Sequence, residues 1–334
     1  MTSVTAPMRP IHHTEPVRVR RSAATDIDAH TEQLIDWNLH YDQLDRGRFD
    51  GNFTDIRWPG LQVFVETTTR QVRQRGHLGQ NTLGVATLLS GDDAIRINGK
   101  RGGTGSLIAV HSAELDVCTP ANCTLAGLVI DADLVRSAAS SMPELSRVLD
   151  AGSLPDIKAP QTSLPSFRTM LMSVVELAID RPATFHDPIV QRDIRDGLIL
   201  HLVQAMADAE RSDEVHGAYA QKRLVDRACE LMLANPEEPP TLLEVCNRIG
   251  ASARKLGYCF QDVLGMSPAR YVKAVRLNAV RRELRSVRDP FISIYDVAAR
   301  WGFWHFGHFS ADYKRQFAEL PSDTLRRARG ASPA

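Results

Sequence analysis

Residues 241–264, TLLEVCNRIGASARKLGYCFQDVL, predict two short helices joined by a turn, and residues 292–317, ISIYDVAARWGFWHFGHFSADYKRQF, repeat the pattern. Each stretch has an apolar-patterned first helix, a glycine in the turn (Gly250 or Gly302), and a second helix with an aromatic or aliphatic inner side. This layout is typical of a helix-turn-helix unit, whose second helix lies in the major groove of DNA. The sequence therefore predicts an all-α region that contains two such units.

In the first unit, the second helix is expected to start near Ala253. Ser252 is a good N-cap for it, because a serine hydroxyl accepts from free backbone amides. The apolar residues that recur at helical spacing, Leu256, Phe260 and Leu264, are expected to face inward. The candidate DNA-binding residues on the outer side are Ser252, Arg254, Lys255, Gly257, Tyr258 and Gln261. The polar side chains suit base edges and phosphates, and a glycine lets the helix approach the groove closely.

The second unit repeats this division between an inner and an outer side. Its inner side is expected to hold Phe309, Tyr313 and Phe317. The outer side is expected to offer His305, His308, Asp312 and Gln316, with Lys314 and Arg315 near the DNA backbone. From this unit, the candidate DNA contacts are Trp304, His305, His308 and Lys314.

A helix is also predicted between the two units, over residues 268–285, PARYVKAVRLNAVRRELR, with Pro268 at its start. A helix of that length spans roughly 27 Å at 1.5 Å per residue. It can therefore hold two recognition helices about one DNA turn apart, near 34 Å, so that one chain occupies two successive major grooves. One such unit alone would be weak evidence, because short amphipathic helix pairs occur in many helical domains.

Charge is divided unevenly along the chain. Residues 221–330 contain 19 Lys and Arg against 12 Asp and Glu, whereas the whole chain contains 40 of each. A basic C-terminal part is expected for a nucleic-acid-binding region. Much of this charge lies on or just after the central helix, and some of these residues are expected to contact phosphates, with Arg276 as a candidate DNA-binding residue. They are Arg270, Lys273, Arg276, Arg281, Arg282, Arg285 and Arg288.

These residues also carry a family resemblance. The segment RLNAVRREL (276–284) and a series of later positions resemble the signature of the AraC/XylS family of bacterial transcription regulators. Those positions are Asp296, Val297, Ala298, Trp301, Gly302, Phe303, Phe309, Tyr313, Phe317, Pro321 and Ser322. Residues 37–56, WNLHYDQLDRGRFDGNFTDI, and 62–66, QVFVE, resemble the sensor half of the subgroup that includes ethanolamine-operon regulators.

The resemblance implies a function and a set of partners. It implies a sequence-specific transcription regulator, an effector-responsive activator of a catabolic operon, rather than an enzyme, with no catalytic residues and no cofactor. The implied partners are double-stranded promoter DNA, a small-molecule effector, RNA polymerase and a second copy of the chain in a homodimer.

The N-terminal part reads as β-rich, which makes the expected fold class α+β. Residues 31–160 contain short β-like runs broken by Gly, Asn and Asp, typical of a sandwich or small barrel. The resemblance implies a cupin-like β-barrel that senses an effector. A metal-binding cupin enzyme is the alternative, but His77 and His111 are isolated and form no His-x-His pair, so no metal site is expected.

A helical segment is expected over residues 161–212. A helix should start at Pro188 and bury one broad apolar face. Packing against the chain's own β-region should account for much of that face, and the resemblance adds dimerisation as a role for the rest.

The remaining boundaries follow from composition. Residues 1–30 are expected to be a mobile tail, 213–221 a linker, and 222–330 the DNA-binding domain. No apolar run is long enough to cross a bilayer and no secretory signal is visible, which favours the cytoplasm. Five cysteines without a Cys-x-x-Cys pair fit a reduced compartment, and buried thiols are favoured over a Cys118–Cys123 redox pair.

Two further functions stay open from the residues alone. One is an architectural DNA-binding protein that senses nothing. The other is a cupin-type enzyme with an accessory DNA-binding domain, which would need catalytic residues in the β-half.

Overall fold

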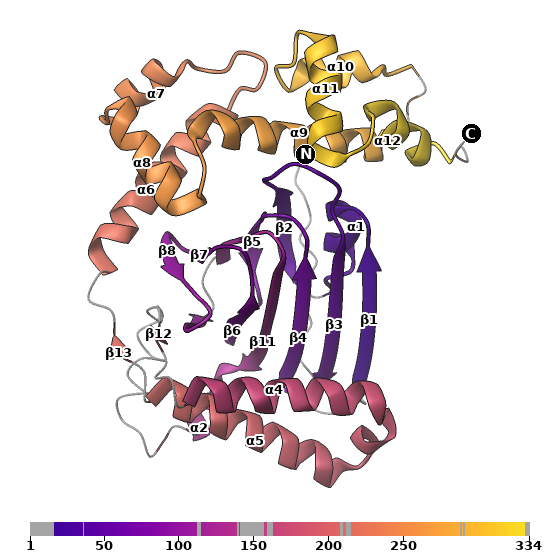
Figure 1. Cartoon of the computed structure of the whole chain (residues 1–334), viewed down its shortest axis with the longest axis vertical. Coiled ribbons are helices and arrows are strands. Elements are labelled where there is room, and N and C mark those ends of the chain that lie inside the picture. Colours follow the sequence, from indigo (N-terminus) through magenta and orange to yellow (C-terminus); the bar gives the residue numbers. More distant parts are fainter. Residues whose placement is uncertain are drawn as a thin grey trace.

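A β-rich half and a helical half make up the chain in the computed structural model (Figure 1). The structure describes residues 17–35, 37–111, 115–138, 140, 157–158, 163–207, 210–211, 215–287, 289 and 291–330. The strands lie in the middle of the molecule, with helices α4 (Ser163–Asp180) and α5 (Pro188–Ala207) on one side and the C-terminal helices on the other.

Two antiparallel sheets form the N-terminal half. The larger has the order β1-β3-β4-β11-β6-β9-β12-β13 and the smaller β2-β5-β10-β7-β8. The longer strands are β1 (Arg18–Ala24), β2 (Asn38–Gln43), β3 (Gly51–Trp58), β4 (Leu61–Thr68), β5 (Val72–His77), β6 (Thr82–Ser90), β9 (Leu107–His111), β10 (Leu115–Thr119) and β11 (Cys123–Asp131). The short ones are β7 (Ile95–Ile97), β8 (Lys100–Gly102), β12 (Ile157–Lys158) and β13 (Glu210–Arg211). This confirms a β-rich N-terminal half and the α+β class.

Both faces of the larger sheet are buried, because neighbouring residues of a strand point to opposite sides. Val63 packs in a cluster with α4 and α5, whereas Phe64 packs in a second cluster with the smaller sheet. Leu128 and Val129 divide in the same way. The helical segment thus covers one face of this sheet, and the smaller sheet covers the other. The helix predicted to start at Pro188 is confirmed as α5.

The expected tail over residues 1–30 was wrong for its second half. Arg18–Ala24 form β1, which pairs with β3 from Arg18 opposite Arg57 to Ala24 opposite Gly51. Helix α1 (Ile27–Glu32) follows at once, with the Asp26 carboxylate accepting from the Ala29 amide at 2.9 Å. The sequence of β1 has few large apolar residues because it is an edge strand, held by backbone hydrogen bonds. Residues 1–16 lie outside the described part.

Helices make up the C-terminal half. They are α6 (Val215–Leu233), α7 (Leu242–Ile249), α8 (Ala253–Leu264), α9 (Pro268–Ser286), α10 (Ile294–Arg300), α11 (Phe306–Phe317) and α12 (Pro321–Ala328). The linker expected at 213–221 was also wrong, because α6 already begins at Val215 and is helical through that stretch. None of the helices that the structure describes is both long and apolar enough to cross a membrane.

The two halves pack closely together. The Asn278 side chain of α9 bonds to both backbone groups of Gln43 at the end of β2, at 3.1 and 2.9 Å. Arg73 of β5 is 2% exposed on its side chain and donates to both oxygens of Asp116 at 2.8 and 2.6 Å. Lys222 of α6 approaches the same carboxylate at 2.7 Å. Burial disfavours the charged form of Asp116, but the Arg73 contact outweighs it and lowers its pKa to about 2.

All five cysteines are buried and unpaired. Cys118 joins the apolar cluster at the junction of the two halves, whereas Cys123 belongs to the cluster between the sheets. Burial raises the pKa of both thiols to about 12. A thiol held in its neutral form in an apolar site is a poor nucleophile, so these two behave as small core residues.

Candidate DNA-binding surface

The first helix-turn-helix unit is built by its caps. Thr241 and Glu244 form a capping box at the start of α7, and Gly250 ends that helix with a φ of 68°. The Ser252 hydroxyl accepts from the Lys255 amide at 3.2 Å and so caps α8. The sequence therefore determines the turn locally, as expected from Gly250 and Ser252.

The outer face of α8 is free. Leu256 and Phe260 face the core, while the side chains of Arg254, Lys255 and Gln261 are exposed. Tyr258 is 59% exposed, and the Arg254 guanidinium lies 5.6 Å from its ring centroid. A Cβ added to Gly257 would meet no atom within 4 Å, so the fold itself leaves this surface open.

In the second unit the exposed candidates gather at the start of α11. Trp304 is 55% exposed, His305 is the N-cap residue, and His308 lies one turn further along. The two imidazole rings are 6.3 Å apart and nearly perpendicular. Lys314 is exposed further along the same helix. The structure thus brings Trp304, His305 and His308 together, with Lys314 on a later turn.

Two residues expected on the outer side of α11 point inward. Asp312 is 9% exposed and pairs with Lys273 of α9 and with Arg315. Burial opposes its ionisation, but these two cations lower its pKa. Gln316 is 5% exposed and donates to the carbonyls of Gln43 and Asp45 at 2.8 and 2.9 Å. The prediction was wrong because polar neighbours from α9 and the β-half cover this side.

Arg276 stands apart from the other candidates. Its side chain is half-buried and donates to the Met232 carbonyl at 3.0 Å, and burial lowers its pKa. Gly302, in the turn of the second unit, would bring a Cβ to 3.4 Å from one Arg276 nitrogen. Arg276 therefore lies between α6 and the turn of the second unit.

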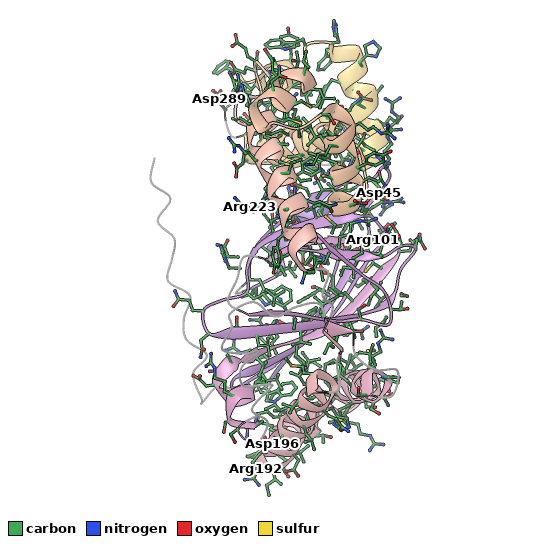
Figure 2. All side chains as sticks on the ribbon, turned by 90° about the vertical axis from the view of Figure 1, so that its left-hand side faces the viewer. Asp45, Arg101, Arg192, Asp196, Arg223 and Asp289 are labelled. Carbon is green, nitrogen blue, oxygen red and sulfur yellow. The ribbon has the colours of Figure 1, made fainter. Side chains whose placement is uncertain are left out.

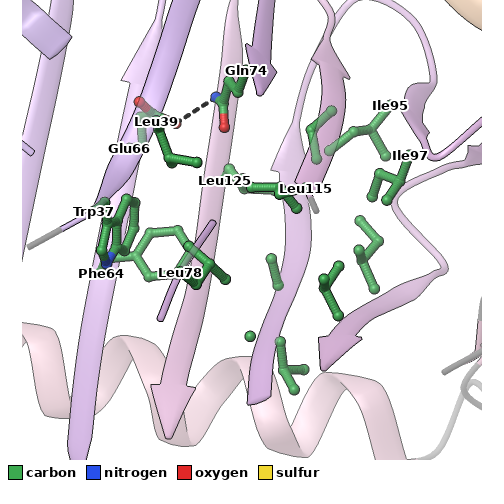
Figure 3. Close-up of a pocket in the computed structure, with 16 residues that line it drawn as sticks. Trp37, Leu39, Phe64, Glu66, Gln74, Leu78, Ile95, Ile97, Leu115 and Leu125 are labelled. Atoms are coloured by element: carbon green, nitrogen blue, oxygen red, sulfur yellow. Dashed lines mark hydrogen bonds between the residues drawn. The ribbon is translucent and has the colours of Figure 1, made fainter. Parts of the chain in front are cut away.

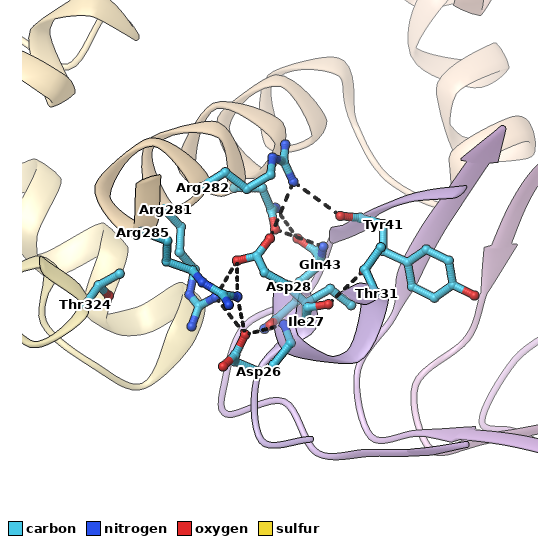
Figure 4. A network of polar contacts seen from close by, with 12 residues as sticks. Asp26, Ile27, Asp28, Thr31, Tyr41, Gln43, Arg281, Arg282, Arg285 and Thr324 are labelled. Carbon is cyan, nitrogen blue, oxygen red and sulfur yellow. Dashed lines mark hydrogen bonds and ion pairs between the residues drawn. The ribbon is translucent and has the colours of Figure 1, made fainter. Parts of the chain in front are cut away.

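The basic residues of α9 lie in different environments. Arg281, Arg282 and Arg285 point towards the β-half, and Arg281 is buried there (Figure 4). Their carboxylate partners are Asp26, Asp28, Glu32, Asp42 and Glu319. These three arginines are therefore not among the basic residues that remain free to contact phosphates. Arg270 is exposed, Lys273 is engaged with Asp312, and Arg288 lies outside the described residues.

Gly302 gives a direct test of the second turn. It has a φ of 78°, and a Cβ would lie 2.5 Å from the Pro236 carbonyl oxygen. We expect Gly302→Ala to lower the free energy of unfolding by about 1–3 kcal/mol in urea titrations. The control is Gly250→Ala, which has a φ of 68° and open space, and should cost about 1 kcal/mol. Equal losses would mean that the Pro236 contact costs nothing.

A comparison with known protein families agrees with this pair of helix-turn-helix units. Residues 245–327 match a family model described as "Helix-turn-helix domain". The C-terminal part of this chain is therefore similar to a helix-turn-helix domain. The matched residues begin within α7 and end within α12, so they include most of the first unit and the whole of the second.

Curated proteins similar to this chain include operon regulators by name. The chain is 31% identical over 139 residues to the "Probable thc operon regulatory protein" of Rhodococcus erythropolis, and the aligned residues make up 42% of each chain. It is 37% identical over 76 residues to "XylDLEGF operon transcriptional activator 1" of Pseudomonas putida, which covers 23% of each. The chain thus spans less than half the length of these curated relatives.

A solved structure is similar over about a third of the chain. The probable AraC family transcriptional regulator from Rhodopseudomonas palustris is 34% identical and covers 32% of this chain and 98% of its own, with a TM-score of 0.30.

Sequence reasoning missed one group that sits away from the helix-turn-helix domain. Glu66, at the end of the QVFVE segment, is buried in the β-half and bonds to His30 at 2.8 Å. The available signal was a carboxylate within an otherwise apolar strand pattern, which is rare unless it has a partner.

Proposed function

We propose that the protein is a sequence-specific DNA-binding transcription regulator of the AraC/XylS family. The observation that carries the proposal is the pair of helix-turn-helix units, which lie at the two ends of α9 (Figure 1). Each unit has exposed polar side chains on its second helix. Because α9 has 19 residues, it spans roughly 28 Å, close to the 34 Å between successive major grooves.

Base contacts are assigned to the two exposed faces. In the first unit, Arg254, Tyr258 and Gln261 read or position bases, while Ser252 and Lys255 meet phosphates and Gly257 permits close approach. In the second, His305 and His308 take the equivalent places, with Trp304 and Lys314 beside them. Arg276 supports the turn of the second unit, and only the outer part of its half-buried side chain contacts a phosphate.

The remaining parts of the proposal concern partners. The β-half senses a small-molecule effector, as in the subgroup of ethanolamine-operon regulators, and the chain activates a catabolic operon through RNA polymerase in the cytoplasm. Helices α4 and α5 form a homodimer contact, which Ile189 and Leu200 of α5 support because they are 60% and 61% exposed. A dimer allows the effector to act by changing the arrangement of two DNA-binding domains.

Selection from random DNA tests the proposal. The purified full chain is incubated with a random duplex library at physiological salt, with and without candidate effectors. We expect enrichment of a defined sequence, because base contacts specify a site beyond the charge attraction. Binding that stays independent of sequence under every condition would contradict the proposal and favour an architectural protein.

Arg254 should contribute to specificity. We expect Arg254→Ala to weaken binding to the selected site by about 1–3 kcal/mol and to relax specificity at one position, if it pairs with guanine. The measurement is a titration by fluorescence anisotropy on the selected site and on single-base variants. Arg101→Ala is the control, because Arg101 is 57% exposed on strand β8 of the β-half (Figure 2) and is assigned neither a DNA contact nor a dimer contact. An equal loss on all sequences would make Arg254 a phosphate contact.

A further inference from the structure

A cavity lies between the two sheets of the β-half (Figure 3). Its volume is about 50 Å³, counted as the space that the centres of water molecules can occupy. This is room for roughly three to five waters or for a small molecule. Apolar residues make up most of its wall, among them Trp37, Leu39, Phe64, Leu78, Ile108 and Leu115. An apolar cavity of this kind favours a ligand over ordered water, because water there lacks hydrogen-bond partners.

One charged group interrupts this wall. Among the described residues that line the cavity, Glu66 is the one with an ionisable side chain, and Gln74 lies beside it (Figure 3). Glu66 is 3% exposed and accepts from Gln74 at 2.9 Å and from His30 at 2.8 Å. An ionised carboxylate offers about four acceptor positions, so positions remain for a ligand that donates.

The wall also has an aromatic side. The rings of Trp37 and Phe64 are 5.0 Å apart and nearly perpendicular. Such a pair presents an edge and a face, the arrangement in which a further ring packs well. The cavity therefore suits a single ring with one donor group directed at Glu66.

The carboxylate is also connected to the DNA-binding half. His30 lies on the short helix α1, and Asp26 and Asp28 stand at the start of the same helix. Asp26 pairs with Arg281 at 3.2 Å and with Arg285 at 2.9 Å, both on α9 (Figure 4). Asp28 and His30 lie within the six residues of α1 and Asp26 caps it, so this helix forms a continuous path from His30 to the carboxylates that meet α9.

We infer that this cavity binds a small, ring-sized molecule with one hydrogen-bond-donating head group on Glu66, and that α1 relays its occupancy from His30 to Arg281 and Arg285. The inference deepens the proposed function by naming the effector class and its path to α9. A ligand with a cationic amine fits best, because it adds a charge-assisted bond to a buried carboxylate. A carboxylate ligand is repelled by Glu66.

The ligand class is tested with three molecules that share a ring: benzylamine, benzyl alcohol and benzoate. Binding to the full chain is followed by intrinsic tryptophan fluorescence, to which Trp37 contributes, and by thermal shift. We expect benzylamine to bind at least about tenfold more tightly than benzoate, the difference a charge-assisted bond makes. Tighter binding of benzoate, or no binding of any of the three, would overturn the inference.

Two variants localise the binding. Glu66→Gln should remove the preference for benzylamine, while Glu237→Gln, an exposed carboxylate on the helical half, should leave it unchanged. Because Glu66 is buried, Leu78→Trp serves as a second variant that fills the cavity without changing charge and should abolish binding of all three molecules. Binding that survives Leu78→Trp would place the site elsewhere.

The relay has a readout that needs no DNA. Amide hydrogen exchange in α1 and α9 should change when benzylamine binds. The double variant Asp26→Asn with Asp28→Asn, which neutralises both carboxylates that meet Arg281 and Arg285, should remove the change in α9 while benzylamine still binds. An unchanged response of α9 in this double variant would overturn the relay. Failure of DNA selection would contradict the regulator proposal alone, because none of these ligand measurements depends on DNA.

Discussion

Replacing Arg73 by Ala should lower the free energy of unfolding by about 3 kcal/mol, the lower end of the range for breaking a buried ion pair. Arg73 is among the largest fully buried side chains and donates to Asp116 through two nitrogens. Its guanidinium also bonds to the Tyr271 hydroxyl of α9. Ala would leave the Asp116 charge buried, with Lys222 as its remaining cation. We expect a loss at the lower end of the range for a broken ion pair, because Lys222 still balances part of the Asp116 charge.

The measurement is urea unfolding of the full chain, followed by circular dichroism. Arg101→Ala is the matched control on strand β8, because Arg101 and its partner Asp93 are 57% and 54% exposed, and it should cost less than about 1 kcal/mol. The pair Arg73→Met with Asp116→Leu should recover most of the loss, because apolar residues of similar size replace buried pairs well. A loss below 1 kcal/mol for Arg73→Ala would contradict the described burial.

Arg281 should have the second largest effect on stability. Its side chain is 3% exposed and meets Asp26 at 3.2 Å, Asp28, and Glu319 at 3.2 Å. We expect Arg281→Ala to cost about 2–4 kcal/mol, because buried carboxylates lose their main cation and the two halves lose a contact. Differential scanning calorimetry should show the single transition broaden or divide as the halves uncouple.

Arg285→Ala gives the contrast on the same helix. Its side chain is 26% exposed and partly solvated, so its loss should cost about 1 kcal/mol or less. Equal effects of the two substitutions would mean that burial of Arg281 does not decide its contribution. A sharp single transition in Arg281→Ala, unchanged in width, would argue that other contacts hold the halves together.

Local sequence signals predicted the helix-turn-helix domain well. Gly250 and Ser252 form the turn and cap that the sequence indicates, and Pro268 begins α9. These features depend on backbone conformation and on hydrogen bonds within four residues, so the chain encodes them in a short window. The exposed face of α8 was predictable for the same reason, since the apolar stripe of the helix shows which side is buried and therefore which residues are exposed.

Tertiary contacts determined what the sequence could not predict. Gln316 looked exposed on the helical pattern, but Gln43, far away in the chain, covers it. Arg281 looked like a phosphate contact, because a charge run gives no sign of carboxylates more than 250 residues away. The edge strand β1 was missed since backbone pairing with β3, rather than apolar residues, holds it.

These contacts change how the basic helix is understood. The arginines at the C-terminal end of α9 attach the helical half to the β-half, while the exposed side chains of α8 and α11 remain at the surface. Under the proposed function, a change in the β-half can therefore reach α9 without altering either recognition helix.

The central claim, one chain with two DNA-reading units, is tested most directly by hydroxyl-radical footprinting on the selected site, with the number of protomers bound counted by native mass spectrometry. The account predicts two protected segments per protomer, about 10 base pairs apart on one face of the duplex. His308→Ala should weaken one segment and Arg254→Ala the other. One protected segment per protomer, or a footprint that both substitutions weaken evenly, would contradict it.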